Sequence, residues 1–530
     1  MMLALSAPRV LADEQDDREA LRAQVEYLTE AQALSAMNIQ IAAGSLIAEI
    51  YANRDFAPAW TDPNQVAELI AVIEGTQAEG LDPTDYYADA VRAVHERMLA
   101  GIVDPDEKAV ADILLTESLI RVGYHQLFGK VNPYTLDPSW NFRRDLNGLD
   151  PAATVQEIID APSLFERLSN LVPRGWMYEG LESALAHYRD IQRAGGWPQV
   201  PDGPTLRPGA ADSRLAVLAR RLAVTGDLEE ARELAIYDEV LERAVRRFQQ
   251  RHALDADGVV GPATLKALNV PVEQRVRQLE LTLERARWVT NGLEDDFLIV
   301  NIAGFQAYLV HGREIAWQTR VQVGRLYRQT PVFRDEMKYL VFNPTWTVPY
   351  SIATRDILPQ VQGDASYLVN RGFTVADRTG RIVDPASVDW SRLSRGNFPY
   401  TLVQGPGPTN ALGRVKFMFP NEHAVYLHDT PNQALFERAD RSFSSGCIRV
   451  EHPFELAERL LGPDWSQQRI RRVVDSGETT TVSLAEPLPV LLLYWTAEVR
   501  TDGTVAFYED VYGRDRAVSA ALDAPFKIER

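Results

Sequence analysis

The sequence has only one cysteine in 530 residues, Cys447, so no disulfide can form within the chain. It also lacks any stretch that approaches the roughly 18 apolar residues of a membrane-spanning helix, because its most apolar run, residues 487–495, has only the length of a strand. An excess of positive charge is absent as well, since the net charge is −19. We therefore expect no membrane span, no nucleic-acid partner and no binding to an anionic membrane surface.

The composition is that of a globular protein, with 45% hydrophobic and 24% charged residues, and the length suffices for several domains. Helical periodicity dominates the first half, a Gly- and Pro-rich linker interrupts it, and a period of two takes over later. The predicted divisions are 1–12, an apolar start that resembles the end of a truncated secretory signal; 13–200, a helical domain; 212–270, a three-helix module; 271–290, a linking helix; 296–484, a mostly β domain with an insertion at about 350–402; and 485–530, a C-terminal hairpin.

The stretch 426–450 concentrates the residues that suit nucleophilic catalysis. Cys447 follows Gly446 in a run of serines that favours a turn with exposed backbone N–H groups. The thiolate is the reactive form of cysteine, an imidazole such as that of His428 can take the thiol proton and return it to a leaving amine, and backbone N–H groups can hold an oxyanion. The alternative is a buried, inert cysteine, but such residues usually sit in apolar segments. We therefore interpret Cys447 as the nucleophile and His428 as the general acid and base.

The apolar run that ends just before His428 has side chains that alternate between two faces, and this alternation limits which of them can meet. It places Tyr426 and His428 on one face of a strand and His423 on the other. Two histidines on opposite faces do not form a metal site with Cys447, and a structural zinc ion needs four protein ligands, so we expect no metal. Asp429 points away from His428 if the strand continues. Either a carboxylate or a backbone carbonyl could then orient the imidazole, and this third member of the site stays open.

The same stretch resembles the catalytic signature of the L,D-transpeptidases, cysteine enzymes that cross-link peptidoglycan. That signature has a histidine, a spacer, and then Ser-x-Gly-Cys followed by an aliphatic residue and usually Arg. This sequence departs from it at Ser445, where many members carry a second histidine, and the departure leaves His428 as the only evident base. The matching residues are His428, Ser444, Gly446, Cys447, Ile448 and Arg449.

The resemblance implies a mechanism that uses no metal and no organic cofactor. Cys447 attacks the diaminopimelate carbonyl of a tetrapeptide stem, His428 protonates the departing D-alanine, and backbone N–H groups near Gly446 and Cys447 hold the oxyanion. An amine on a neighbouring stem then attacks the thioester, which gives a 3→3 cross-link. The resemblance also implies acylation of Cys447 by carbapenems. The expected substrate contacts are Tyr426, Ser444, Ser445 and Arg449, of which Arg449 can alternatively brace the loop.

Other parts of the chain resemble the larger Gram-negative members of this family. Residues 255–264 form a tight turn that feeds a helix, as in the small three-helix peptidoglycan-binding module, so we expect 212–270 to bind the cell wall. The Phe-x-Pro-x-Trp element at 56–60 resembles the N-terminal scaffold domain, and 350–402 resembles the substrate-capping subdomain. The predicted fold class is multidomain α+β: an all-α scaffold, the small module and a mostly β catalytic domain.

We expect a periplasmic L,D-transpeptidase whose partners are peptidoglycan stem peptides and glycan. The same residues would also serve a cysteine L,D-carboxypeptidase or endopeptidase that transfers to water, or an enzyme that attaches a lipoprotein lysine to peptidoglycan. A non-catalytic wall-binding protein is a different class, and it has no need of the thiol and imidazole. The acceptor and the oligomeric state stay open at this point.

Overall fold

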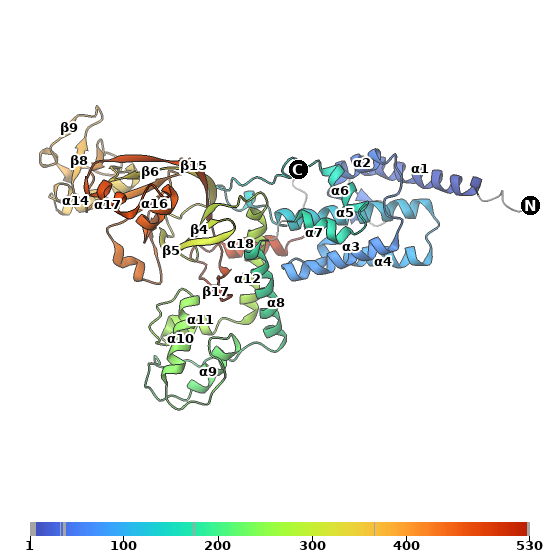
Figure 1. Ribbon diagram of the computed structural model, residues 1–530, viewed down its shortest axis with the longest axis horizontal. Coiled ribbons are helices and arrows are strands. Elements are labelled where there is room, and N and C mark those ends of the chain that lie inside the picture. The colour runs from blue at the N-terminus through green and yellow to red at the C-terminus, as the bar shows by residue number, and fades with distance from the viewer. Residues whose placement is uncertain (1–6, 32, 35–38, 173–174, 365, 527–530) are drawn as a thin grey trace, which may run out of the picture.

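The computed structural model describes residues 7–31, 33–34, 39–172, 175–364 and 366–526. N-terminal helices lie at one end of the molecule, a β-rich body at the other, and a small helical module projects to one side (Figure 1). The predicted fold class is confirmed by this order of a helical region and a mostly β domain. Among the described residues, no helix has the length and apolar character to cross a membrane.

Three helices of the N-terminal region begin at an Asp-Pro pair. The carboxylates of Asp62, Asp104 and Asp150 each accept a hydrogen bond from a backbone N–H of the first turn, and the proline takes the first helical position, where no N–H is needed. Of the expected signal segment, residues 1–6 lie outside the described residues, and the remainder begins the first helix. The elements are α1 (Ala7–Ala31), β1 (Ala33–Leu34), β2 (Ile39–Gln40), α2 (Gly44–Asn53), α3 (Pro63–Gly75), η1 (Thr76–Glu79), η2 (Pro83–Tyr86), α4 (Ala88–Ala100), α5 (Pro105–Phe128), η3 (Pro133–Thr135), α6 (Pro151–Ile159), α7 (Leu164–Leu171) and α8 (Trp176–Arg193).

The loop at 56–60 is packed against α5 through one buried carboxylate. Asp112 of α5 accepts hydrogen bonds from the backbone N–H of Ala59 at 2.9 Å and of Trp60 at 3.1 Å, and from the Tyr51 hydroxyl at 2.6 Å. Burial raises the pKa of Asp112, and these hydrogen bonds oppose that rise. The element therefore has a structural role in this helical region.

The small module comprises α9 (Leu215–Val224), α10 (Glu239–Arg251) and α11 (Pro262–Leu268). Gln249 of α10 holds the turn before α11, because its amide donates to Asp257 Oδ1 at 2.9 Å and to the Val259 carbonyl at 3.0 Å. A β-bridge between Leu206 and Val260 ties the preceding segment to this turn. The module thus includes residues before position 212, where we expected it to begin.

The expected linking helix is α12 (Val272–Thr290), and it belongs to two cores. Leu281 packs in the core of the N-terminal helices, whereas Leu283 packs in the core of the β domain. Arg287, which is 1% exposed, donates to Glu284 Oε2 at 2.7 Å and to the Tyr178 hydroxyl at 2.8 Å. A buried cation needs such partners, so α12 is fixed between the two domains.

A single nine-stranded sheet forms the body of the β domain. Its strands in chain order are β3 (Phe297–Asn301), β4 (Gln306–His311), β5 (Glu314–Gly324), β6 (Phe333–Phe342), β11 (Val415–Met418), β12 (Leu427–His428), β13 (Ser442–Ser444), β14 (Ile448–Val450) and β15 (Thr480–Leu493). Their spatial order is β13-β5-β14-β12-β11-β6-β15-β3-β4, and β4 also pairs with β5, so the strand order closes on itself. The short η7 (Gln433–Glu437) and the helices α16 (Pro453–Leu461) and α17 (Gln467–Asp475) complete the domain.

The insertion expected at 350–402 is a separate subdomain with its own sheet and core, at the end of the molecule farthest from the N-terminus (Figure 1). We call it the insertion subdomain, residues 346–404. Its sheet order is β7-β10-β8-β9. The elements are β7 (Trp346–Thr347), α13 (Tyr350–Ile352), the π-helical η4 (Ala353–Ile357), α14 (Leu358–Gly363), α15 (Tyr367–Asn370), β8 (Phe373–Ala376), β9 (Ile382–Val383), η5 (Pro385–Ser387), η6 (Trp390–Arg392) and β10 (Thr401–Gln404).

The expected C-terminal hairpin at 485–530 is largely wrong. Residues 488–493 continue β15, which lies between β6 and β3 in the main sheet. Val490 to Leu493 are almost completely buried, as suits a central strand covered on both faces. The hairpin is confined to β16 (Ala497–Val499) and β17 (Val505–Phe507), and the chain then forms α18 (Asp515–Asp523).

Candidate active site

Two short parallel strands, β12 and β14, bring the ends of the 426–450 stretch together. Their register pairs Leu427 with Ile448, and both side chains are fully buried in the core. Because side chains alternate along a strand, the residues next to this pair point to the opposite face. These residues are Tyr426 and His428 from one segment and Cys447 and Arg449 from the other.

The first of these strands is shorter than the alternation suggests. Ala424, which we expected within it, has a φ of +52°, and residues 422–423 form a turn. The amide of Asn421 donates to the Val425 carbonyl at 2.7 Å and closes this turn. His423 packs its ring against Phe333 with the centroids 4.8 Å apart.

His428 is 4% exposed and is oriented by main-chain carbonyls. Its Nδ1 lies 2.5 Å from the Asp429 carbonyl oxygen. Burial lowers the pKa of His428 to about 3, the Arg449 charge acts in the same direction, and hydrogen bonds to the carbonyls of Asp429 and Leu412 oppose the shift. The imidazole is therefore neutral near pH 7. With its Nδ1 proton held by a carbonyl, its Nε2 lone pair is available to accept a proton.

The Asp429 carboxylate bonds backbone N–H groups and does not orient the imidazole. Its oxygens accept hydrogen bonds from the backbone N–H of Arg414 at 2.8 Å and of Thr430 at 2.7 Å. It thus fixes the loop that precedes β11. The third member that the sequence left open is a backbone carbonyl in this structure.

Cys447 is half-buried beside Tyr426. Its Sγ donates a long hydrogen bond of 3.8 Å to the Ala424 carbonyl. Burial raises the pKa of the Cys447 thiol, while hydrogen bonding with Tyr426 and the positive charge of Arg449 act in the opposite direction. A neutral thiol therefore shares this face with a neutral imidazole.

The turn before Cys447 is closed by a serine side chain. Ser444 Oγ donates to the Cys447 carbonyl at 2.5 Å and accepts from the Gly446 N–H at 3.1 Å. Gly446 has a φ of +119°, which L side chains rarely adopt. Because its N–H is taken by Ser444, Gly446 is not the free oxyanion donor that we expected. The Cys447 N–H, in contrast, donates no hydrogen bond within the described part of the chain.

Residues far away in the sequence hold this turn in place through hydrogen bonds. Thr330 Oγ1 donates to the Gly446 carbonyl at 2.8 Å and accepts from the Gly324 N–H at 2.9 Å. The Tyr512 hydroxyl donates to the Gly324 carbonyl at 2.5 Å. Gly324 has no room for a side chain, because an added Cβ would lie 2.1 Å from the Arg328 carbonyl oxygen. The position of the turn thus depends on the last residue of β5 and on Tyr512 in the C-terminal region.

Arg328 connects the turn to the insertion subdomain. Its Nη1 donates to Ser445 Oγ at 2.8 Å and to Asp356 Oδ2 of η4 at 2.5 Å. π-helical turns such as η4 are rare in proteins, and those that occur are frequently found at functional sites. Ser445 therefore occupies the place of the second histidine with a hydroxyl that is held by an arginine.

Arg449 and Tyr426 flank the thiol and the imidazole. The Arg449 side chain donates to Gln322 Oε1 of β5 at 3.1 Å, which is the bracing arrangement that we considered for it. The ring of Tyr426 lies 5.7 Å from that of His428. Burial raises the pKa of the Tyr426 hydroxyl, and the neighbouring Cys447 raises it further. Tyr426 therefore stays protonated and can donate a hydrogen bond.

Within the described residues, no group of three or more His, Cys, Asp or Glu side chains could hold a metal ion. His452 lies at the start of α16 with its Nε2 3.8 Å from a Glu451 carboxylate oxygen, and its side chain is half exposed. His311 pairs with Asp296 at 2.9 Å in an exposed turn.

Comparison with known families matches three regions of the chain. Residues 45–185 match the scaffold domain, 213–268 match a putative peptidoglycan binding domain, and 295–484 match the L,D-transpeptidase catalytic domain. Residues 295–484 are thus similar to the L,D-transpeptidase catalytic domain. Cys447 and His428 both lie inside the region that this family describes.

Individual relatives are more distant or partial. A putative L,D-transpeptidase of Haemophilus influenzae is 37% identical over 225 residues, which are 42% of this chain and 45% of that protein. The N-acetylmuramoyl-L-alanine amidase CwlM of Mycobacterium tuberculosis is 35% identical over 80 residues, 13% of this chain and 20% of that protein. The chain thus spans less than half the length of the curated relatives that it matches. The crystal structure of an L,D-transpeptidase (Yku) from Stackebrandtia nassauensis covers 56% of this chain and 96% of its own, with 12% identity and a TM-score of 0.23, which carries no argument.

Proposed function

We propose that the protein is a peptidoglycan L,D-transpeptidase that acts through a thioester on Cys447. One observation carries the proposal: Cys447 and His428 share one face of two paired strands inside an L,D-transpeptidase catalytic domain. The imidazole there is neutral and keeps its Nε2 lone pair for a proton. Such a nucleophile and base suit acyl transfer.

In the first half of the reaction, the Cys447 sulfur attacks the diaminopimelate carbonyl of a tetrapeptide stem. The thiol proton passes to His428 Nε2 as the sulfur–carbon bond forms. The Cys447 N–H supports the oxyanion, because the Gly446 N–H is already bonded to Ser444. When the tetrahedral intermediate collapses, the carbon–nitrogen bond breaks, and D-alanine leaves with the proton from His428.

In the second half, the amine of a neighbouring stem attacks the thioester carbonyl. His428 takes a proton from that amine and returns it to the sulfur, so Cys447 leaves as a thiol and the balance of protons is restored. The product is a 3→3 cross-link. Transfer to water would make the enzyme a carboxypeptidase, and transfer to a lipoprotein lysine would attach that protein to the wall. We infer that the insertion subdomain, which Arg328 links to Ser445, limits the access of water to the thioester and so favours the amine.

The module around α9–α11 is proposed to bind the cell wall, which its family match supports. We also propose a periplasmic location, which the wall-directed reaction proposed above and the family match of this module support. A chain without residues 206–268 should sediment less with isolated sacculi than the full chain. Equal sedimentation by a correctly folded deletion would remove the binding role from the module.

The direct test of the function uses purified muropeptides. Mass spectrometry of the products from tetrapeptide-bearing muropeptides, with and without an amine acceptor, separates cross-linking from hydrolysis. We expect 3→3 cross-linked dimers and free D-alanine. A tripeptide as the sole product in the presence of an acceptor would assign the carboxypeptidase reaction, and an unchanged muropeptide would remove the proposed activity altogether.

A further inference from the structure

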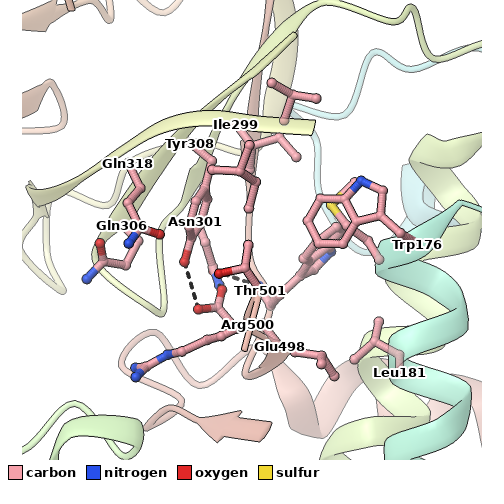
Figure 2. A pocket seen from close by; sticks show the side chains of 15 residues that line it. Trp176, Leu181, Ile299, Asn301, Gln306, Tyr308, Gln318, Glu498, Arg500 and Thr501 are labelled. Carbon is pink, nitrogen blue, oxygen red and sulfur yellow. Dashed lines mark hydrogen bonds between the residues drawn. The ribbon is translucent and has the colours of Figure 1, made fainter. Parts of the chain in front are cut away.

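A pocket that none of residues 426–450 line opens where three parts of the protein meet (Figure 2). Its floor is the outer face of β3, β4 and β5, one wall is the start of α8, and the other wall is the hairpin of β16 and β17. Its volume is about 210 Å³. Pockets for drug-sized molecules begin at roughly 300 Å³, so this one suits a single ring with its substituents. Residues that line it include Trp176, Leu181, Gln306, Tyr308, Gln318 and Glu498.

The charges in this pocket are already balanced. Glu498, which is 8% exposed, accepts hydrogen bonds from the Tyr308 hydroxyl at 2.7 Å, from the Asn301 amide at 3.0 Å and from the Tyr508 hydroxyl. Arg500 donates to the Gln250 carbonyl at 3.0 Å. Arg500 and Glu498 lie close enough for their charges to interact, so a ligand of either charge would meet one attractive and one repulsive group. The occupant should therefore be neutral.

Two amides in the pocket, in contrast, have no hydrogen-bond partner among the residues that the structure describes. Gln306 and Gln318 lie on the same sheet face as Tyr308, because Tyr308 is paired with Gln318 and stands two residues from Gln306. Within the described residues, neither glutamine side chain makes a hydrogen bond. A carboxamide is both donor and acceptor, and Figure 2 shows both side chains on the floor across from the indole of Trp176 on α8. Amides on one side of a pocket and an indole on the other suit a ring with hydroxyl or acetamido groups on its rim and C–H groups on its face.

The pocket also adjoins the small module. The hairpin that forms its second wall contacts α10, because Arg500 bonds the Gln250 carbonyl and Arg251 donates to the Val505 carbonyl at 3.3 Å. Figure 1 shows the module below this hairpin and the sheet above it. A polymer held by the module would therefore meet the pocket on its way to the catalytic domain.

We propose that this pocket binds one N-acetylated sugar ring of the glycan strand. The inference rests on the proposed function for the choice of polymer, because peptidoglycan is the glycan that a transpeptidase meets. The Gln306 and Gln318 amides bond the acetamido and hydroxyl groups, and the Trp176 indole covers one face of the ring. The pocket thus fixes the glycan while the stem peptide reaches Cys447.

The test uses a peptide-free tetramer of β-1,4-linked N-acetylglucosamine and the full chain, with binding measured by titration calorimetry and saturation-transfer NMR. No chemistry is involved, so failure of the proposed activity would leave this result unaffected. Gln318→Ala should weaken binding about five-fold, on the order expected for one lost neutral hydrogen bond. Trp176→Leu should weaken it about three- to ten-fold through the lost aromatic contact. Glu314→Ala, an exposed change on the same strand outside the pocket, should change nothing.

Gln318 is exposed and unpaired, so Gln318→Ala should fold, and its thermal unfolding should match that of the parent. Equal affinity of the tetramer for the parent and for Gln318→Ala and Trp176→Leu would place glycan binding outside this pocket. An absence of binding to the parent would overturn the site altogether. A sugar-free stem tetrapeptide provides the second arm: if it binds and Gln318→Ala weakens it, the pocket takes peptide and the saccharide assignment is wrong.

Discussion

The Nη1 atom of Arg328 lies 2.8 Å from the hydroxyl oxygen of Ser445, two residues before the proposed nucleophile. The same atom lies 2.5 Å from the carboxylate of Asp356 in the insertion subdomain. One guanidinium therefore joins the catalytic turn to a subdomain that has its own core. A shift of either partner is transmitted to the other through a charge-assisted hydrogen bond.

Removing this link should loosen the insertion subdomain over the thioester. Arg328→Gln and Asp356→Asn should each raise the donor KM and shift turnover from cross-linking toward hydrolysis, because water gains access to the acyl-enzyme. Product ratios from muropeptides measure this directly. Arg381→Gln, which breaks an exposed ion pair with Asp377 in the same subdomain, is the matched control and should behave as the parent. An identical product ratio in Arg328→Gln and the parent would show that the link has no part in partitioning.

Removal of the proposed base, His428, should lower activity far more than removal of His423, which lies five positions earlier. General acid–base help is worth roughly 10²–10⁴-fold, so His428→Ala should lower kcat/KM on that order. His423→Ala should cost much less, because His423 packs against Phe333. Equal losses in the two variants would mean that His428 is not the base.

The protonation states predict an unusual pH profile for the free thiol. Burial holds the pKa of Cys447 above its ordinary value and that of His428 at about 3. The rate of iodoacetamide modification should therefore rise from about pH 7 to pH 10 as the thiolate forms, with no inflection near the ordinary histidine pKa of about 6.5. His428→Gln should leave this profile almost unchanged. A plateau of high reactivity already present at about pH 6 would instead indicate a thiolate–imidazolium pair.

Two buried threonines on neighbouring segments differ in whether the side-chain hydroxyl makes a hydrogen bond. Thr330 Oγ1 links Gly446 to Gly324, whereas the buried Thr319 Oγ1 has no partner in the described part of the chain. Thr330→Val should lower the free energy of unfolding by about 1–3 kcal/mol, since it leaves a carbonyl and an N–H unpaired. Thr319→Val should be neutral or stabilising. Denaturant unfolding of both variants, with kcat, tests whether the turn depends on Thr330.

The catalytic turn could be predicted from sequence because its residues are contiguous. Ser444 and Gly446 act within three positions of Cys447, and the alternation around Leu427 reveals which side chains share a face. The contacts that brace the turn could not be predicted in this way. Thr330 lies 116 positions from Gly446, and Tyr512 lies 188 positions from Gly324, and nothing local marks a hydroxyl that will bond a distant backbone.

The differences from the predictions have physical causes at both long and short range. The run before Tyr494 has the length and composition of a hairpin strand, but pairing with β3 and β6 buries it at the centre of the sheet. The strand that carries His428 is cut short because Asn421 closes a turn in front of it. Of the backbone N–H groups that were expected to hold the oxyanion, that of Gly446 donates to Ser444, two residues away. Competition of a serine side chain for a backbone donor is common in turns.

The central claim is that the reaction passes through a thioester on Cys447, and trapping that species tests it most directly. The enzyme is mixed with a tetrapeptide stem without an acceptor, quenched in acid, and analysed by intact-protein mass spectrometry followed by peptide mapping. The account predicts an adduct whose mass is the stem minus D-alanine, carried by Cys447 and absent from Cys447→Ser in the same experiment. Release of D-alanine by Cys447→Ala at the parent rate, or an adduct on a residue other than Cys447, would contradict it.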